Sequence, residues 1–289
     1  MQYEGKVDMS DSRYQIVPCG QCIGCRIERS RQWMVRIMHE AQLFEHNCFL
    51  TLTFDDEHLP TDGSLSVRDL QLFMKLLRKH NKGFEPVKDE KTGKITFPIR
   101  FFACGEYGSL NERPHYHLII FNWQPDDMVL RGVNKFGNKL YTSPKIMQYW
   151  DKGFNTVGTV TEQSAGYVAK YCIKKVTGSA AEEHYRGRLP EFIVMSRRPG
   201  IAARWFDKYQ EDIYNYDECI LHGTKYRVPR YYDKLYDDVN PCKFAQVKAN
   251  RLLKAQKFAG ELLNSYRLSI KELKTKLYLE KRERNVVSC

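Results

Sequence analysis

Two histidines separated by a single residue are the most informative residues of the chain. They lie in the segment Arg113–Phe121, RPHYHLIIF, which ends in an apolar run typical of a buried strand. Successive side chains of a strand point to opposite faces, so His115 and His117 share one face and Tyr116 points to the other. Two imidazoles on one face can bind a transition or divalent metal ion. The alternative is a pair of histidines that make ordinary hydrogen bonds.

A carboxylate on the neighbouring strand is the natural third ligand. Glu106 closes the strand-like segment FFACGE, nine residues before His115, and turn-forming residues lie between them. This pattern predicts an antiparallel hairpin that brings Glu106 close to the two imidazoles. Glu112 is the second choice, because it lies within the turn and is held less rigidly. A solvated acid at the edge of the sheet is the alternative for Glu106.

Two tyrosines lie four residues apart in the segment GYVAKYCIKK, which begins at Gly166. On a helix, Tyr167 and Tyr171 share one face. Lys170 and Lys174 each follow one of these tyrosines by three residues. A phenol can attack phosphorus, and ammonium groups offset the charge of a phosphate, so the segment suits phosphoryl transfer. The alternative is an amphipathic helix with two core tyrosines and solvated lysines.

The periodicity of apolar residues predicts the elements that must position these groups. Helical patterns cover residues 26–45, the stretch from a capping box at Ser66 and Asp69 to about residue 80, residues 144–150 and residues 163–176. Strand patterns cover residues 48–54, 99–107, 115–122 and 153–161, and a surface hairpin is expected within 81–97. This order predicts an α+β fold with an antiparallel sheet of about five strands in a split βαβ arrangement, ferredoxin-like or RRM-like.

The last part of the chain is basic and helical. Residues 244–283 are predicted to form one or two long helices, and Lys243–Arg284 contains 12 basic and 4 acidic residues, within a chain of net charge +11. This balance favours a polyanionic partner, although a solvated helix face also explains such a tail. We therefore expect an N-terminal cysteine-containing loop and helix (1–47), a central domain (48–205) and a C-terminal helical basic extension (206–289).

The composition excludes several classes of protein. With 42% hydrophobic residues among 289, the chain can build a core and is not disordered. No apolar run approaches the ~20 residues of a membrane helix, and the first residues lack the pattern of a secretory signal. Nine cysteines, an odd and scattered set, favour a reducing cytosol over a disulfide scaffold. The nucleotide-binding pattern GxxxxGKS/T is missing, so any duplex unwinding is expected from another protein.

Cys19, Cys22 and Cys25 have the two-residue spacing of thiolate ligands. Zinc is the natural occupant, yet tetrahedral structural zinc requires four ligands and only three are evident. Cys48 or His39 could supply a fourth, and an iron–sulfur cluster has the same shortfall. The alternative is a loop of small, reduced cysteines that packs against the following helix.

Candidate nucleic-acid contacts lie on two of the predicted elements. Thr51 and Thr53 in strand 48–54 can line a DNA groove, or they can simply satisfy strand propensity. The helix at 26–45 carries four arginines that can contact phosphates or be solvated in the ordinary way: Arg26, Arg29, Arg31 and Arg36.

Taken in order, the FLTLT strand, the HYH segment and the YVAKYxxK helix resemble the HUH endonuclease superfamily. Its members nick single-stranded DNA in rolling-circle replication, conjugation and transposition. The cysteine-containing segment 18–33 and the segment Met195–Ile201, MSRRPGI, are similar to those of microvirus (gokushovirus) replication initiators. The resemblance covers roughly residues 15–205, and the residues after about 210 do not contribute to it.

The resemblance implies a specific chemistry. Mg²⁺ or Mn²⁺ would bind His115, His117 and an acid, for which Glu106 is the first choice. One tyrosine would attack the scissile phosphate, leaving a 5′-phosphotyrosine and a free 3′-hydroxyl, and the second would cleave the regenerated origin. Thr51, Thr53 and Arg113 are the expected DNA contacts.

The resemblance also implies partners and a place of action. The substrate would be single-stranded origin DNA of a viral replicative form, in the cytoplasm of a bacterial host. A host polymerase would extend the 3′-hydroxyl, and a host helicase would unwind the duplex. No membrane partner is expected.

Other functions remain as alternatives at this stage. A plasmid initiator or an HUH transposase would use the same chemistry. A non-enzymatic single-stranded nucleic-acid-binding protein could use the same sheet, but the exposed aromatic pattern of RNA-binding sheets is missing. A packaging or structural protein with a basic tail would leave the histidine and tyrosine pairs unexplained.

Overall fold

The computed structural model describes residues 18–81, 83–84, 87–88, 95–108, 111–134, 137–176, 178–257 and 265–287. For residues 87, 95, 171–174, 265 and 278–287 the description covers the backbone only. The helices are α1 (Ile23–Ala41), α2 (Val67–His80), α3 (Pro144–Tyr149), α4 (Glu162–Lys174), α5 (Ala180–Tyr185), α6 (Ala203–Tyr216), α7 (Arg230–Val239), α8 (Pro241–Gln256) and α10 (Ser265–Val287). The strands are β1 (Asn47–Phe54), β2 (Val87–Lys88), β3 (Ile95–Thr96), β4 (Arg100–Tyr107), β5 (Pro114–Phe121), β6 (Val129–Val133), β7 (Lys139–Thr142), β8 (Gly153–Gly158), β9 (Phe192–Met195), β10 (Cys219–Leu221) and β11 (Thr224–Tyr226).

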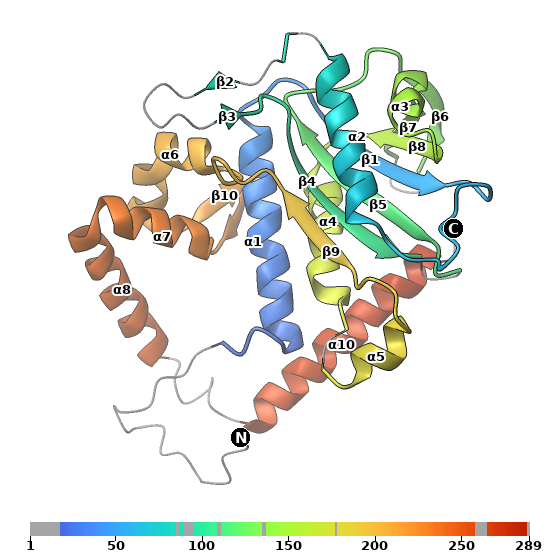
Figure 1. Ribbon diagram of the computed structural model, residues 1–289. Coiled ribbons are helices and arrows are strands. Elements are labelled where there is room, and N and C mark those ends of the chain that lie inside the picture. Colours follow the sequence, from blue (N-terminus) through green and yellow to red (C-terminus); the bar gives the residue numbers. More distant parts are fainter. Residues whose placement is uncertain are drawn as a thin grey trace.

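The main sheet is antiparallel and has seven strands in the order β6-β7-β8-β1-β5-β4-β9 (Figure 1). Strand β5 lies between β1 and β4 and is antiparallel to both, so β1-α2-β4 is a split βαβ unit. The predicted α+β class and split βαβ order are confirmed. The sheet is wider than the five strands expected, because β6, β7 and β9 extend its two edges.

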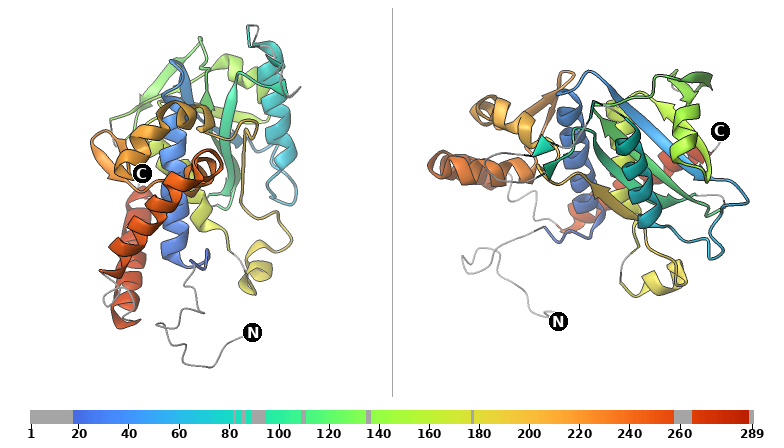
Figure 2. Two further views of the ribbon diagram at one scale, coloured as in Figure 1. Left: turned by 90° about the vertical axis from the view of Figure 1, so that its left-hand side faces the viewer. Right: turned by 45° about the horizontal axis from the view of Figure 1, so that its top comes forward.

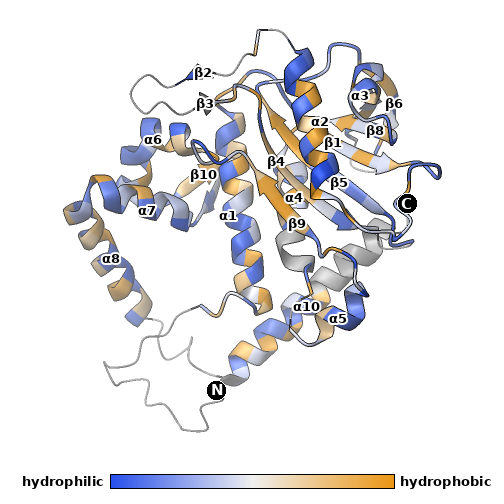
Figure 3. Ribbon diagram, in the orientation of Figure 1, coloured by the Kyte–Doolittle hydropathy of each residue, from blue (hydrophilic) through white to orange (hydrophobic). Residues whose placement is uncertain are grey.

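The two faces of the sheet carry separate apolar clusters. In β1 the residues alternate between partly exposed and buried, and the buried set Cys48, Leu50, Leu52 and Phe54 packs with α2 and α3. The opposite face packs against α1 and α4. Figure 2 shows α1 and α2 on opposite sides of the sheet, and Figure 3 shows that the strands between them are apolar. Helices on both faces therefore hold the central strands rigid.

Helix α1 belongs to the core more than its arginines suggested. Arg36 is buried, donates from Nε and Nη2 to the backbone oxygen of Ile201, and lies between the rings of Trp33 and Tyr231. The expectation that Arg36 lies on a phosphate-contacting face is therefore wrong, because this side chain holds the C-terminal helices instead. Arg31 pairs with Glu28 on the same helix.

The helices after residue 200 pack on α1 as part of the same apolar cluster. Phe244 at the start of α8 is buried against Tyr214 and Tyr236. Arg251 further along α8 donates to the carboxylates of Asp217 and Asp233. The long helices predicted for 244–283 are thus confirmed as α8 and α10, and α8 is anchored by its first turn. None of the described helices is both long and apolar enough to cross a membrane.

Acid should weaken the junction between α1 and the C-terminal helices. His39 is buried, stacks on Trp205 and lies 2.9 Å from the hydroxyl of Tyr232, and burial lowers its pKa to about 3. Its folded-state pKa is below the usual value near 6.5, so stability is complete above pH 6.5 and is lost as the pH falls. We expect a loss of about 2 kcal/mol between pH 7 and pH 5, measured by urea unfolding.

The matched variant for this measurement is His39→Phe, which keeps an aromatic ring against Trp205 but cannot take up a proton. Its free energy of unfolding should change less between pH 7 and pH 5 than that of the wild type. An equal change in the two proteins would show that other groups cause the acid sensitivity.

Candidate active site

Three potential metal ligands converge on the sheet face that packs against α4. In the β4–β5 hairpin, Glu106 lies directly opposite His115 in register, and His117 projects from the same face two residues later. Oε1 of Glu106 lies 2.8 Å from Nε2 of His115 and 3.0 Å from Nε2 of His117. The hairpin thus brings these three residues together in the way that the sequence predicted.

The spacing of the three donor atoms fits a small divalent cation. All of them lie within 4.8 Å of one another. Neighbouring ligands of an octahedral ion at about 2.1 Å are separated by about 3.0 Å, which is close to the distances from Glu106 to the two imidazoles. An ion bound by these three groups keeps further coordination positions for water or phosphate oxygens, as a catalytic site requires.

The carboxyl group of Glu106 is held in its charged form. Its side chain is only 3% exposed, and burial by itself raises the pKa. Hydrogen bonds with His115 and His117, together with their positive charge, outweigh burial and lower the pKa of Glu106 to about 2. The group is therefore an anion at neutral pH, which is the form that binds a cation.

Each histidine is oriented through its second ring nitrogen. Nδ1 of His115 lies 3.0 Å from the backbone oxygen of Arg113, and Nδ1 of His117 lies 2.9 Å from Oγ1 of Thr51. A carbonyl oxygen only accepts a hydrogen bond, so Nδ1 of His115 donates and Nε2 is the atom left for a metal ion. Thr51, expected as a DNA contact, orients His117 in the structure.

Tyr167 on α4 faces the histidine pair. Its ring meets the ring of His117 edge-on with 5.0 Å between centroids, and it meets Phe49 edge-on at 6.3 Å. The side chain of Tyr167 is 37% exposed, so it can also meet a substrate. The start of α4 is fixed by a reciprocal cap between Thr161 and Ser164. A rigid helix therefore carries a phenol to the edge of the candidate metal site.

The other expected residues of α4 follow from its backbone. Tyr171 and Lys174 lie one turn beyond Tyr167 and Lys170 on the same helix, so the shared face predicted from the spacing is kept. The side chains of Tyr171 and Lys174 lie outside the described residues. Lys170 is partly buried.

Arg113 and Thr53 lie beside the triad, whereas Glu112 does not join it. Thr53 is directly opposite His115 in register and shares its face. Nη2 of Arg113 donates to Asp56 at 2.7 Å, an ion pair with a 92% exposed carboxylate. Such a pair is weak and can be exchanged for a phosphate. Glu112, the second choice as a ligand, pairs with Arg188 at 2.8 Å and lies outside the group of potential ligands.

Sequence analysis missed two aromatic residues on this face. Phe49 stacks on His117 with 5.8 Å between ring centroids, and it also meets Tyr167. Phe154 lies directly opposite Thr53 on β8 and is 55% exposed. Residues directly opposite in an antiparallel pair share a face, so Phe154 extends the row that contains His115 and Thr53. The pairing of Thr53 with Phe154 joins segments a hundred residues apart, and no local pattern reveals it.

Comparisons with known proteins match the region that contains this site. The family model for the replication-associated protein ORF2 matches residues 47–176. The chain is 36% identical over 244 residues to replication-associated protein VP4 of Bdellovibrio phage phiMH2K, covering 84% of this chain and 74% of that protein. It is 32% identical over 264 residues to replication-associated protein ORF2 of Spiroplasma virus 4, covering 86% and 78%. A third relative, replication-associated protein ORF4 of Chlamydia phage 1, is 30% identical over 76% of this chain and 53% of its own length. No solved structure matches the chain significantly.

Proposed function

Because the chain belongs to the family of phage replication-associated proteins, we propose that it cleaves and rejoins single-stranded DNA at a phage replication origin. The relatives support a role in phage DNA replication. The site supports the chemistry, and one observation carries the proposal: the Tyr167 ring lies 5.0 Å from the His117 ring, on the sheet face of a buried Glu106.

Each residue of the site has a distinct task in this proposal. Glu106, His115 and His117 would hold Mg²⁺ or Mn²⁺, and the ion would withdraw charge from the scissile phosphate. Thr51 keeps the His117 ring in the orientation that presents Nε2. Lys170 and Lys174 offset phosphate charge along the same helix as the nucleophile.

The proposed reaction is a transesterification by a tyrosine. The phenolic oxygen of Tyr167 loses its proton and forms a bond to phosphorus. The bond from phosphorus to the 3′ oxygen breaks, and that oxygen takes up a proton as a free 3′-hydroxyl. The product is a 5′-phosphotyrosine, and attack by a 3′-hydroxyl on the same phosphorus reverses the step and joins strands.

A second tyrosine completes a replication round without releasing the DNA. Tyr171, one helical turn after Tyr167, cleaves the regenerated origin. The released 3′-hydroxyl then attacks the first phosphotyrosine and closes a circle. Host polymerase and host helicase supply extension and unwinding in the bacterial cytoplasm.

The path of the DNA strand follows the exposed groups around the site. Arg113 on one side can exchange Asp56 for a backbone phosphate, and Phe154 on the other side offers an exposed ring to an unstacked base. Stacking of bases on aromatic rings is a general mode of single-strand binding. We therefore propose that the strand crosses the sheet face between these two residues.

Removal of the Phe154 ring should weaken single-strand binding. One base stacked on an aromatic ring contributes about 1–3 kcal/mol, so Phe154→Ala should lower the affinity for an origin oligonucleotide about tenfold. Phe154→Trp should keep it. The measurement is fluorescence anisotropy with EDTA present, so that cleavage does not interfere.

The control for this prediction is Leu72→Ala on α2, which removes a 39% exposed apolar side chain from the opposite side of the sheet. It should leave the affinity unchanged. Equal affinities of wild type and Phe154→Ala would place the strand elsewhere.

Metal-dependent cleavage is the experiment that tests the proposed function. Purified protein should cut a single-stranded origin oligonucleotide when Mg²⁺ or Mn²⁺ is added, and chelation should stop the reaction. A polymerase should extend the new 3′ end. Cleavage that continues after complete chelation would contradict the role given to Glu106, His115 and His117.

A further inference from the structure

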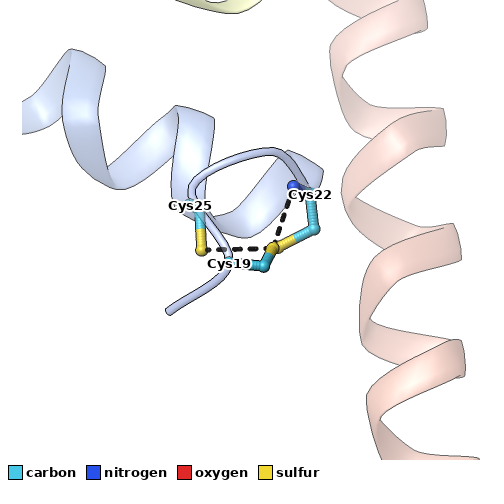
Figure 4. A group of neighbouring side chains, drawn as sticks. All are labelled: Cys19, Cys22 and Cys25. Atoms are coloured by element: carbon cyan, nitrogen blue, oxygen red, sulfur yellow. Dashed lines mark hydrogen bonds between the residues drawn. The ribbon is translucent and has the colours of Figure 1, made fainter. Parts of the chain in front are cut away.

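A second cluster of potential metal ligands lies outside the region matched by the family model. Sγ atoms of Cys19, Cys22 and Cys25 all lie within 4.8 Å of one another, and Cys19 and Cys25 are 3.9 Å apart (Figure 4). These residues precede residue 47, where the family match begins. The proposed strand cleavage does not use them.

The backbone is folded so that the three thiols converge. Cys22 is the N-cap of α1 and Cys25 lies in its first turn, so one helical turn brings these two together. Gly20 has a φ of +74°, a conformation that glycine adopts easily, and it turns the preceding residue back toward the helix. The backbone N–H of Cys22 then donates to Sγ of Cys19 at 3.3 Å, the kind of bond that orients a metal thiolate.

The sulfur spacing fits a single ion. Tetrahedral zinc with bonds of about 2.3 Å holds its thiolates about 3.8 Å apart, which is close to the separation of Cys19 and Cys25. An iron–sulfur cluster binds each thiolate through a different iron, which requires a wider spacing. The N-terminus of α1 also stabilises the net negative charge of three thiolates around Zn²⁺.

The fourth position is open to solvent among the described residues. Cys19 and Cys22 are exposed, and the group of potential ligands contains no further cysteine, histidine or acid. Cys48 and His39, considered from the sequence as a fourth ligand, are buried elsewhere. Cys48 packs under α2 and α3, and His39 bonds with Tyr232. Water is therefore the fourth ligand that the geometry allows.

The cluster is connected to the tyrosine helix. Arg26, the residue after Cys25, donates from Nη1 to the backbone oxygen of Lys175 at 3.1 Å, at the end of α4. Helices α1 and α4 also pack closely, with Gly166 of α4 against Met34 of α1. An ion that fixes the first turn of α1 therefore also fixes the end of the helix that carries Tyr167 and Tyr171.

We propose that Cys19, Cys22 and Cys25 bind one zinc ion, with water as the fourth ligand, and that this ion holds the first turn of α1 against the end of α4. The site is structural and separate from the proposed catalytic ion.

Cobalt substitution tests the ligand set on the full chain. Protein stripped of metal under reducing conditions should develop a thiolate-to-cobalt charge-transfer band with one equivalent of Co²⁺, and Zn²⁺ should abolish it. The band should be lost in Cys22→Ser and kept in Cys242→Ser, which changes an exposed cysteine outside the cluster. It should also be kept in the His115→Ala/His117→Ala double variant, since imidazoles give no such band. Absence of the band in wild type, or its survival in Cys22→Ser, would overturn the proposal.

Alkylation of the wild-type protein avoids any folding defect of a variant. Zinc should protect Cys19, Cys22 and Cys25 from iodoacetamide, while Cys242 reacts equally with and without zinc. Equal labelling of the three cysteines in both states, or a disulfide between them in reducing buffer, would refute the site.

Hydrogen exchange tests the link to the tyrosine helix. Removal of zinc should raise amide exchange in residues 22–30 and at the end of α4. Arg26→Gln should raise exchange only at the end of α4 and should keep the zinc. Unchanged exchange in α4 after both treatments would limit the ion to α1. None of these readouts depends on DNA cleavage, so the site can fail or stand independently of the proposed function.

Discussion

His115→Ala and His117→Ala will each abolish metal-dependent cleavage of origin DNA while leaving most single-strand binding intact. Both imidazoles direct Nε2 toward the same oxygen of Glu106, so loss of either removes one of three ligands from the candidate site. Metal stabilisation of a phosphoryl transition state is worth several kcal/mol, and each 1.36 kcal/mol is a factor of ten, so we expect a loss of at least about a thousandfold.

Binding should survive because it does not require the ion. Contacts of Arg and Lys with phosphates supply most of the affinity for a nucleic acid, and they depend on salt rather than on the metal. The measurement compares cleavage rates with Mg²⁺ and anisotropy with EDTA for the same preparations. Full cleavage by the double variant in Mg²⁺ would remove the metal role from these histidines.

Two acids of the hairpin provide a matched control. Glu106→Gln keeps the size of the side chain and removes the charge that binds a cation, so it should cut the cleavage rate and raise the Mg²⁺ concentration needed. Glu112→Gln changes an acid nearby in sequence that pairs with Arg188 instead, and it should leave both unchanged. An equal effect of the two substitutions would contradict the ligand set.

Much of the central sheet could be predicted because its signals are local. The strand at β1, the cap at Ser66 and the hairpin of β4 and β5 each depend on residues close together in the chain. In the structure Oγ of Ser66 accepts a hydrogen bond from the backbone N–H of Asp69, and Glu106 faces His115. Alternation then placed both histidines on one face without knowledge of any distant contact.

Other features depend on contacts between distant segments and could not be predicted. Arg36 has the sequence context of a surface arginine, but it is buried because Trp33, Tyr231 and the Ile201 backbone surround it. Strands β6, β7 and β9 are short, and β9 is recruited to the sheet only by pairing with β4. Phe154 is a similar case, since its position beside the site follows from its pairing with Thr53.

The tyrosine pair gives the second large effect. Tyr167→Phe and Tyr171→Phe should each still nick origin DNA and form a covalent adduct, because the remaining phenol shares the helical face. The slower variant should be the one that lacks the tyrosine acting first in the wild type. Neither single variant should complete a replication round, because no free phenol remains for the second cleavage. The double variant should neither nick nor attach, a complete loss of activity.

The substitution is conservative for the fold. Phenylalanine keeps the ring that meets Phe49 and His117 and removes only the hydroxyl, so helix content and unfolding midpoint should match the wild type. If one single variant alone loses all activity, the enzyme has one nucleophile and the other tyrosine is structural. We then expect Tyr167 to be the nucleophile, since its ring approaches His117.

Denaturing gel analysis of protein–DNA adducts is the most direct test of a tyrosine nucleophile at this site. Wild type and both single variants, incubated with labelled origin oligonucleotide and Mg²⁺, should each give a band that survives denaturant and disappears on protease treatment. Mass spectrometry of that band should place the DNA on Tyr167 or Tyr171. The double variant should give no band, whereas a persistent adduct in the double variant would contradict the proposed mechanism.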